Sequence, residues 1–245
     1  MTKNKKRSKK AATPPPPKKK AKGPVEFGIR PGAVFAAGFR GYAANLVPLT
    51  LAGLIVLATY AAFRYPSQQF LDDDRVWAAR FTDLAGLFIA GTLAYPWYRY
   101  ALAAADGDKV DIAAPFATPR RFGYQAAASF WFFAAVVLGQ QYLGGLPAIL
   151  AALLYAFYGY VVAENDNGGL KALGTSVRLG ERRRIGLFAI GGMLFVFNIL
   201  GASGLAAGLN PLGYSLAVVG LSVTTSITLV SGAAIYRVLQ EKLNE

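Results

Sequence analysis

The sequence predicts an all-α fold: a six-helix transmembrane bundle with short amphipathic interfacial helices between the spans. Three observations predict it. The chain has 245 residues, of which 54% are hydrophobic and only 16% are charged, whereas a soluble domain usually carries about 25% charged residues. Six apolar runs each approach the roughly 20 residues that a helix needs to cross a bilayer. The basic residues gather on the segments that join these runs on one side.

The first 27 residues are expected to form a disordered cytosolic tail. Residues 1–22 contain ten Lys or Arg residues and no acidic residue, and they supply most of the net charge of +13. Like charges repel, and the run Pro14–Pro17 extends the chain. The tail either helps to orient the protein or tethers it to anionic lipid. Because nucleic-acid binding would rest on charge alone, we do not expect a nucleic-acid partner.

Residues 28–240 are expected to form one membrane domain, followed by a short cytosolic C-terminus over residues 241–245. The domain begins with an interfacial helix in which Phe35, Phe39 and Tyr42 share one face. The predicted spans are Asn45–Phe63, Leu84–Leu102, Tyr124–Leu143, Leu146–Ala163, Ile185–Leu205 and Leu212–Tyr236.

Polar features inside or beside the spans have simple interpretations. Arg99, in an aromatic belt at the end of the second span, is expected to reach the headgroups. Gly204 and Gly208 have GxxxG spacing, which indicates either close helix packing or a loose helix end. The Ser and Thr residues of the last span are expected to serve packing rather than a transport pathway.

Two acidic stretches are not predicted to bind cations. The run Asp72–Asp74 lies in the polar and aromatic segment Arg64–Asp83. It is expected to be a solvated loop that caps a helix carrying Trp77 and Phe81. The stretch Asp106–Asp111 departs from a calcium loop because Val110 stands where a fifth-place oxygen ligand is needed. The chain contains no Cys and no His, which excludes thiolate nucleophiles and Cys/His zinc sites. We therefore expect no metal, no cofactor and no catalysis.

The segment before the fifth span has the strongest amphipathic pattern. Leu170, Leu173 and Val177 share one helix face, and Lys171, Thr175, Arg178 and Arg182 share the other. Such a helix is expected to lie in the headgroup plane with its apolar face in the acyl boundary. Similar units before the first and third spans, at residues 31–42 and 112–123, predict a three-fold internal repeat of helix pairs. The candidate lipid-headgroup contacts are Arg40, Arg120, Arg121, Lys171, Arg178, Arg182, Arg183 and Arg184.

The distribution of basic residues predicts the topology. With residues 1–44 placed inside, all but three of the 26 Lys and Arg residues lie on inside segments. The three exceptions are Arg64, Arg75 and Arg80. By the positive-inside rule this split predicts six spans in the cell membrane, with both termini in the cytosol.

Several short motifs, in a fixed order, carry a family resemblance. The first motif runs from Ala101-Leu102 to Asp106-Gly107 and is followed by Phe116, ten residues beyond Asp106. The second is Pro147, which opens a span. The others are Gly169–Leu173 with Ser176–Leu179, and Val218–Leu221 with Ala234–Arg237. From Pro31 to Leu239 the chain resembles a broad bacterial integral-membrane family related to the membrane domain of glycerophosphoryl diester phosphodiesterases. The resemblance implies six helices with interfacial segments between pairs. It implies no catalysis, because the hydrolase of the fused members is a separate domain.

Three function classes remain. The first is a non-enzymatic protein that organises inner-leaflet anionic lipids or a partner membrane protein. The second is a transporter or lipid-translocating protein, which usually has ionisable residues or broken helices near the midplane; here the charges lie at the span ends. The third, an intramembrane enzyme, is disfavoured because the carboxylates lie in loops without an evident partner.

Overall fold

The computed structural model describes residues 29–140, 142–165, 168–181 and 183–244. Over these residues the chain is helical and contains no strand, and six segments are long and apolar enough to cross a membrane. The prediction of an all-α fold with six segments able to cross a membrane is confirmed, as expected for a multi-pass membrane protein. The interfacial position of the amphipathic helices stays a prediction. The predicted tail over residues 1–27 and the candidate contact Arg182 lie outside the described residues.

The helices follow one another in a simple order. They are α1 (Pro31–Ala44), α2 (Leu46–Asp72), α3 (Val76–Ala105), α4 (Arg120–Gly139), α5 (Leu146–Leu154), α6 (Tyr158–Glu164), α7 (Gly169–Leu179), α8 (Arg184–Gly201) and α9 (Pro211–Asn244). Three short 3-10 helices, η1 (Ala114–Ala117), η2 (Leu143–Gly145) and η3 (Ala202–Ala207), lie between them. The fourth crossing consists of η2, α5 and α6, and the fifth of α8 and η3.

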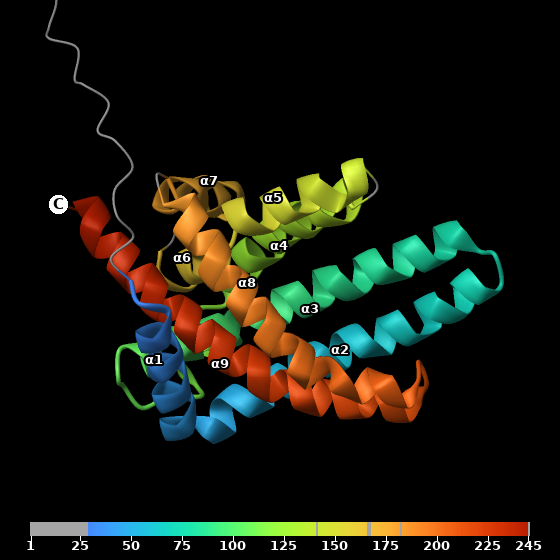
Figure 1. Cartoon of the computed structure of the whole chain (residues 1–245), viewed down its shortest axis with the longest axis horizontal. Coiled ribbons are helices and arrows are strands. Elements are labelled where there is room, and N and C mark those ends of the chain that lie inside the picture. Colours follow the sequence, from blue (N-terminus) through green and yellow to red (C-terminus); the bar gives the residue numbers. More distant parts are fainter. Residues whose placement is uncertain (1–28, 141, 166–167, 182, 245) are drawn as a thin grey trace, which may run out of the picture.

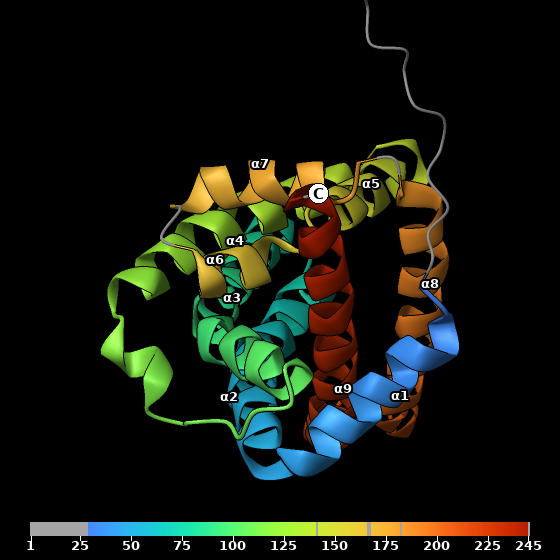
Figure 2. The same cartoon turned by 90° about the vertical axis from the view of Figure 1, so that its left-hand side faces the viewer.

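The long helices run along the longest axis of the molecule (Figure 1). The turn between α2 and α3 lies at one extreme, here called the hairpin end. Helix α7 and the end of α9 lie at the other, here called the α7 end. Figure 2 faces the α7 end and shows α1 and α7 lying across the ends of the long helices.

The first helical hairpin is longer than the sequence predicts. Helices α2 and α3 have 27 and 30 residues, whereas α4 has 20. The expected loop at Asp72–Asp74 is found at residues 73–75, and Trp77 and Phe81 lie on α3. The predicted span ends at Phe63 and Leu84 are wrong, because both helices continue to this turn. Helix α2 continues through Pro66, and Asp74 takes the positive φ of 57° at which the chain reverses.

The second of the three expected amphipathic units contains little helix. Between α3 and α4, a segment described without a gap, Ala114–Ala117 form a single 3-10 turn. Pro115 and Pro119 account for this, since proline removes a backbone donor and restricts the residue before it. The three-fold repeat therefore stays a prediction.

Small residues allow α8 and η3 to approach α9 closely. A Cβ on Gly220 would clash with the backbone of Gly201, and one on Gly204 would clash with the backbone near Ala217. Of the predicted Gly204–Gly208 pair, Gly204 packs closely, whereas Gly208 has φ +108° and ends η3. The close contact is thus made by Gly201 and Gly204 against α9.

Hydroxyl groups of α9 form hydrogen bonds to neighbouring helices in the protein core, as expected for packing rather than for a transport pathway. Ser226 is buried and accepts a hydrogen bond of 3.0 Å from the Trp97 indole N–H. Its single O–H is shared between the Ser222 carbonyl of its own helix at 2.6 Å and the Leu49 carbonyl at 3.0 Å. Thr225 donates to the Asn198 side chain at 2.9 Å. These bonds join α9 to α2, α3 and α8, as packing contacts do.

Candidate functional site

Helix α7 presents a mixed basic and apolar face at the α7 end. Its other face is buried against α4 and α6, and includes Ala172, Leu173 and Ser176. On the exposed face Leu170 is 63% exposed, beside Lys171 and Arg178. The expectation that Leu170 and Leu173 share a lipid-facing surface is wrong, because Leu173 belongs to the protein core.

Most of the candidate lipid contacts are exposed. The exposed ones are Arg40, Arg120, Lys171, Arg178 and Arg184. None of these five forms an ion pair with another described residue. Arg183 is half-buried, and its Nε is buried without a hydrogen-bond partner in the described part of the chain. Five positive charges on α1, α4, α7 and α8 are thus left open to solvent or lipid.

Arg121 behaves differently from its neighbour Arg120. It is half-buried, and it donates to the backbone carbonyl groups of Ala163 and Glu164, the latter at 3.3 Å. Arg99 donates to the same Ala163 carbonyl at 3.2 Å. Carbonyl groups at a helix C-terminus lack partners within the helix and carry partial negative charge, so arginine suits the end of α6. Arg99 and Arg121 therefore both donate hydrogen bonds to backbone carbonyl groups of the protein, and these N–H groups are not available to lipid headgroups.

A cluster of charged and polar side chains joins α3, α6 and α9 at the α7 end. It consists of Asp106, Glu164, Tyr236, Arg237 and Gln240. Arg237 donates to both carboxylate oxygens of Asp106 and also to Glu164. Tyr236 and Gln240 donate to Oε2 of Glu164 at 2.6 and 2.9 Å. Since these bonds are all internal, we interpret this Arg237 cluster as a structural link rather than a ligand site.

The fourth crossing is broken between α5 and α6. The predicted span Leu146–Ala163 lies within Leu143–Glu164, which is long and apolar enough to cross a membrane, but residues 155–157 interrupt its helix. Ser176 of α7 donates to the Leu154 carbonyl at 3.0 Å and accepts from the Phe157 backbone N–H at 3.0 Å. Buried backbone groups in apolar surroundings need such partners. Ser176 therefore supplies hydrogen bonds in place of the helical ones that are lost at residues 155–157. No local pattern in the sequence of the fourth span predicts this contact.

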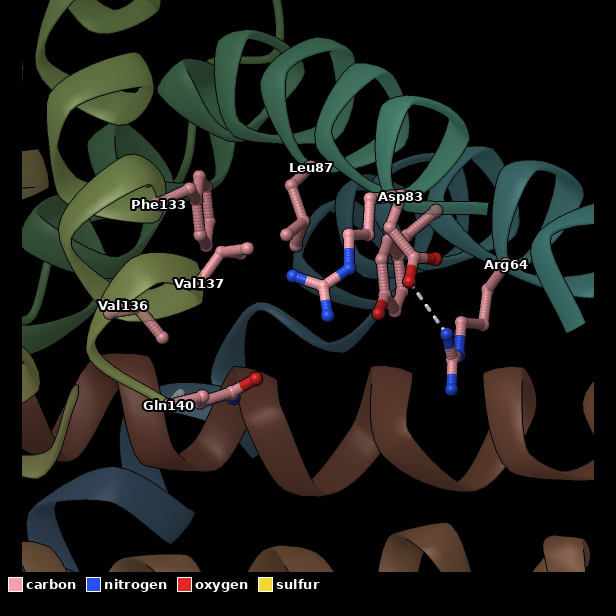
Figure 3. Close-up of a pocket in the computed structure, with 9 residues that line it drawn as sticks. Arg64, Asp83, Leu87, Phe133, Val136, Val137 and Gln140 are labelled. Carbon is pink, nitrogen blue, oxygen red and sulfur yellow. Dashed lines mark hydrogen bonds and ion pairs between the residues drawn. The ribbon is translucent and has the colours of Figure 1, made fainter. Parts of the chain in front are cut away.

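A cavity of about 440 Å³ lies between α2, α3 and α4, toward the hairpin end. Its lining residues are Tyr60, Arg64, Arg80, Asp83, Leu87, Phe133, Val136, Val137 and Gln140. Figure 3 shows Phe133, Val136 and Val137 on one side, with Leu87, Asp83 and Arg64 facing them. A second cavity of about 290 Å³, between α2 and α9, shares Tyr60 and Arg64 with the first.

Hydrogen bonding in the first cavity is incomplete. Arg64 Nη1 lies 2.7 Å from Asp83 Oδ2 (Figure 3). The other carboxylate oxygen, Asp83 Oδ1, is buried and has no hydrogen-bond partner among the described residues. Arg80 pairs with no acidic side chain there; its guanidinium lies 5.9 Å from the Trp77 ring centroid. The cavity is therefore lined by one cation without a carboxylate partner, Arg80, and by a carboxylate whose Oδ1 is closed off from solvent.

The polar part of this cavity lies about one bilayer thickness from the α7 end. At 1.5 Å per residue, Arg64 is about 27 Å from the start of α2, and Asp83 is about 33 Å from the end of α3. These two helix ends are adjacent, since Asn45 bonds to Asp108 and Val110 just beyond α3. The hydrocarbon core of a bilayer is about 30 Å thick.

The sequence offered one signal for this cavity that our prediction did not use. Arg80 and Asp83 are three residues apart, so on a helix they share a face. Their relation to Arg64 depends on the tertiary pairing of α2 with α3 and was not predicted.

Among the described residues, no group of three or more His, Cys, Asp or Glu side chains could hold a metal ion. No protein-family model, curated protein or solved structure matches the chain. The resemblance to the phosphodiesterase-related membrane family therefore stays a prediction.

Proposed function

We propose that this protein is a non-enzymatic multi-pass membrane protein that binds and organises acidic lipids at the α7 end. The observation that carries the proposal is the exposed side of α7, which carries Lys171 and Arg178, seven residues apart on one face, and the 63% exposed Leu170. The opposite face is buried in the protein, which holds this surface in a fixed position. Anionic headgroups pair with the two cations while the leucine enters the acyl boundary.

The charge distribution supports a cytosolic location for the α7 end. The positive-inside rule puts the basic segments on the cytosolic face of the cell membrane, where anionic lipids attract them. Each Lys or Arg near an acidic leaflet contributes about 1 kcal/mol, and salt screens it. In this arrangement α1 and α7 are the interfacial helices, and a membrane-protein partner would meet the same surface.

Charge removal at exposed positions tests the proposal. The triple variant Lys171→Gln, Arg178→Gln and Arg184→Gln should retain less phosphatidylglycerol or cardiolipin in native mass spectra than the wild type. Thr175→Gln, on the same helix, is the matched control and should retain both lipids. If the triple variant inserts correctly and keeps its acidic lipids, the basic residues are topological markers and the proposal fails.

Lipid translocation is the second candidate function. The break between α5 and α6 and the amphipathic cavity near Arg64 favour it, because broken helices and polar groups beside apolar walls occur in transporters. Lipid scrambling measured in liposomes, with and without the purified protein, separates the two candidates. Scrambling above the protein-free rate supports translocation, and its absence supports a binding role.

A further inference from the structure

We propose that the cavity between α2, α3 and α4 binds a phospholipid whose phosphodiester headgroup carries a hydrogen-bond donor, as ethanolamine and glycerol headgroups do. The site lies toward the hairpin end, in the leaflet opposite to the α7 end. It is independent of the acidic-lipid binding proposed above, since none of its residues lies on α1, α7 or α8.

Asp83 specifies the donor. Its Oδ2 atom pairs with Arg64 at 2.7 Å, whereas Oδ1 is buried with no partner among the described residues. Oδ1 is closed off from solvent, so an occupant reaches this carboxylate at Oδ2. The Asp83 side chain is 24% exposed, and a carboxylate oxygen bonded once to Arg64 can accept a second hydrogen bond. An ethanolamine ammonium or a glycerol hydroxyl supplies that bond, whereas choline has neither an N–H nor an O–H group. The phosphocholine headgroup therefore leaves Asp83 with Arg64 alone.

Arg80 specifies the phosphate. Arg80 is exposed and lines the open cavity, and its guanidinium pairs with no carboxylate of the described chain. Arginine binds phosphate oxygens through charge-assisted hydrogen bonds. Arg80 and Asp83 are three residues apart on α3 and so lie on one helix face. One headgroup therefore reaches the cation with its phosphate and the carboxylate with its donor.

The apolar lining fits the remainder of a lipid. Leu87 lies one helical turn from Asp83 toward the α7 end, and Phe133, Val136 and Val137 face it from α4 (Figure 3). Arg64 and Asp83 lie at headgroup depth, so the lining changes from polar to apolar toward the bilayer centre, as a phospholipid does. A volume of about 440 Å³ is within the range of small-molecule pockets and holds a headgroup with the first part of its chains.

Lipid titration of the full-length protein tests the site. Protein freed of lipid in detergent is titrated with phosphatidylethanolamine or phosphatidylcholine of identical acyl chains, and bound lipid is counted by native mass spectrometry. Both lipids have the same net charge, so the basic α7 end does not discriminate between them. The wild type should bind phosphatidylethanolamine at least about tenfold more tightly, the value expected for one hydrogen bond to a charged group. Equal binding of the two lipids would overturn the proposal.

Variants assign the effect to the cavity. Asp83→Ala should abolish the preference for ethanolamine, and Arg80→Gln should weaken phosphatidylethanolamine binding about tenfold. Arg80→Gln leaves the Arg64–Asp83 pair intact, so it tests the site even where Asp83→Ala fails to fold. Asp73→Ala and Arg75→Gln, exposed at the same end outside the cavity lining, should bind as the wild type does. Wild-type binding by both cavity variants, or equal losses in the controls, would refute the assignment.

A soluble headgroup identifies the source of the phosphodiester. Glycerophosphoethanolamine has the same headgroup without acyl chains, so it should bind much more weakly than the lipid because it leaves Leu87, Phe133 and Val137 without contacts. Equal affinity would show that the occupant is a soluble phosphodiester and would overturn the lipid assignment. Mutation of Lys171 and Arg178 should leave the ethanolamine preference unchanged, so this proposal and the proposed function can fail separately.

Discussion

Arg237 and Asp106 pair across 131 positions of the sequence: Arg237 Nε and Nη2 donate to the two carboxylate oxygens of Asp106 at 2.7 and 2.5 Å. This bidentate contact ties α9 to the end of α3. The two side chains are 31% and 33% exposed, so solvent screens part of the interaction.

The first prediction follows from that pair. Asp106→Asn should lower the free energy of unfolding by about 1 kcal/mol, because it removes one charged, bidentate partner at a partly exposed site. Asp108→Asn, on the same connection and also exposed, is the control and should be neutral. Thermal unfolding in one detergent measures both, and equal stability of wild type and Asp106→Asn would contradict the prediction.

The second prediction concerns the break in the fourth crossing. Ser176→Ala should destabilise the protein by about 1–3 kcal/mol, because the Leu154 carbonyl and the Phe157 N–H lose their partner in a buried site. Thr175→Val is the matched control, since the Thr175 hydroxyl bonds to the Lys171 carbonyl of its own helix at 3.1 Å. Unfolding by a denaturing detergent measures the stability of each variant relative to the wild type. Equal stability of Ser176→Ala and Thr175→Val would contradict the prediction and would show that the Ser176 hydroxyl is dispensable, for example because a water takes its place.

The third prediction concerns the contact between Gly201 and Gly220. Gly220→Leu should lower the free energy of unfolding by at least about 1–3 kcal/mol. The Cβ of the new leucine would meet the Gly201 backbone, which cannot move aside as a side chain can. Gly192→Leu adds the same side chain to α8 at a position with no neighbour near its Cβ. It should leave stability nearly unchanged in the same thermal unfolding assay, and a similar loss in both variants would argue against close packing at Gly220.

The fourth prediction concerns orientation. The chain has no cysteine, so a single introduced cysteine gives an unambiguous labelling signal. In intact cells a membrane-impermeant thiol reagent should label Asp73→Cys at the hairpin end and should leave Asp108→Cys unlabelled until the cells are opened. The reverse pattern would invert the topology and place the basic residues outside.

Hydropathy predicted the spans because crossing a bilayer constrains about 20 consecutive residues, and that constraint is visible in any single run. It predicted their ends poorly. Helix α2 continues to Asp72, well beyond the predicted end at Phe63, since a helix continues past the apolar region wherever a neighbouring helix supports it. The run Asp72–Asp74 marked the turn at residues 73–75, but the polar composition on both sides of it did not reveal that those residues are helical.

The site residues depended on contacts between distant segments. The exposed Lys171 and Arg178 follow from helical periodicity, and the sequence predicted their face. Arg64 with Asp83, and Ser176 with the break at residues 155–157, depend on how helices pair and cross. No pattern within one helix encodes those distances, so they appear only in the folded chain.

The unequal helix lengths of the first hairpin and α4 have a consequence for how the protein sits in the membrane. At 1.5 Å per residue, α2 and α3 are about 40 and 45 Å long, and α4 about 30 Å. The extra length of the hairpin is polar: it lies beyond Arg64 and Asp83, which share a cavity with Gln140 at the end of α4. The hairpin therefore extends about 12 Å past the level of Arg64. There Trp77 and Phe81 are 75% and 70% exposed, and aromatic side chains favour the membrane–water interface. We therefore expect the tip of the hairpin to lie among the headgroups, with its exposed rings limiting how deeply the protein sits in the bilayer.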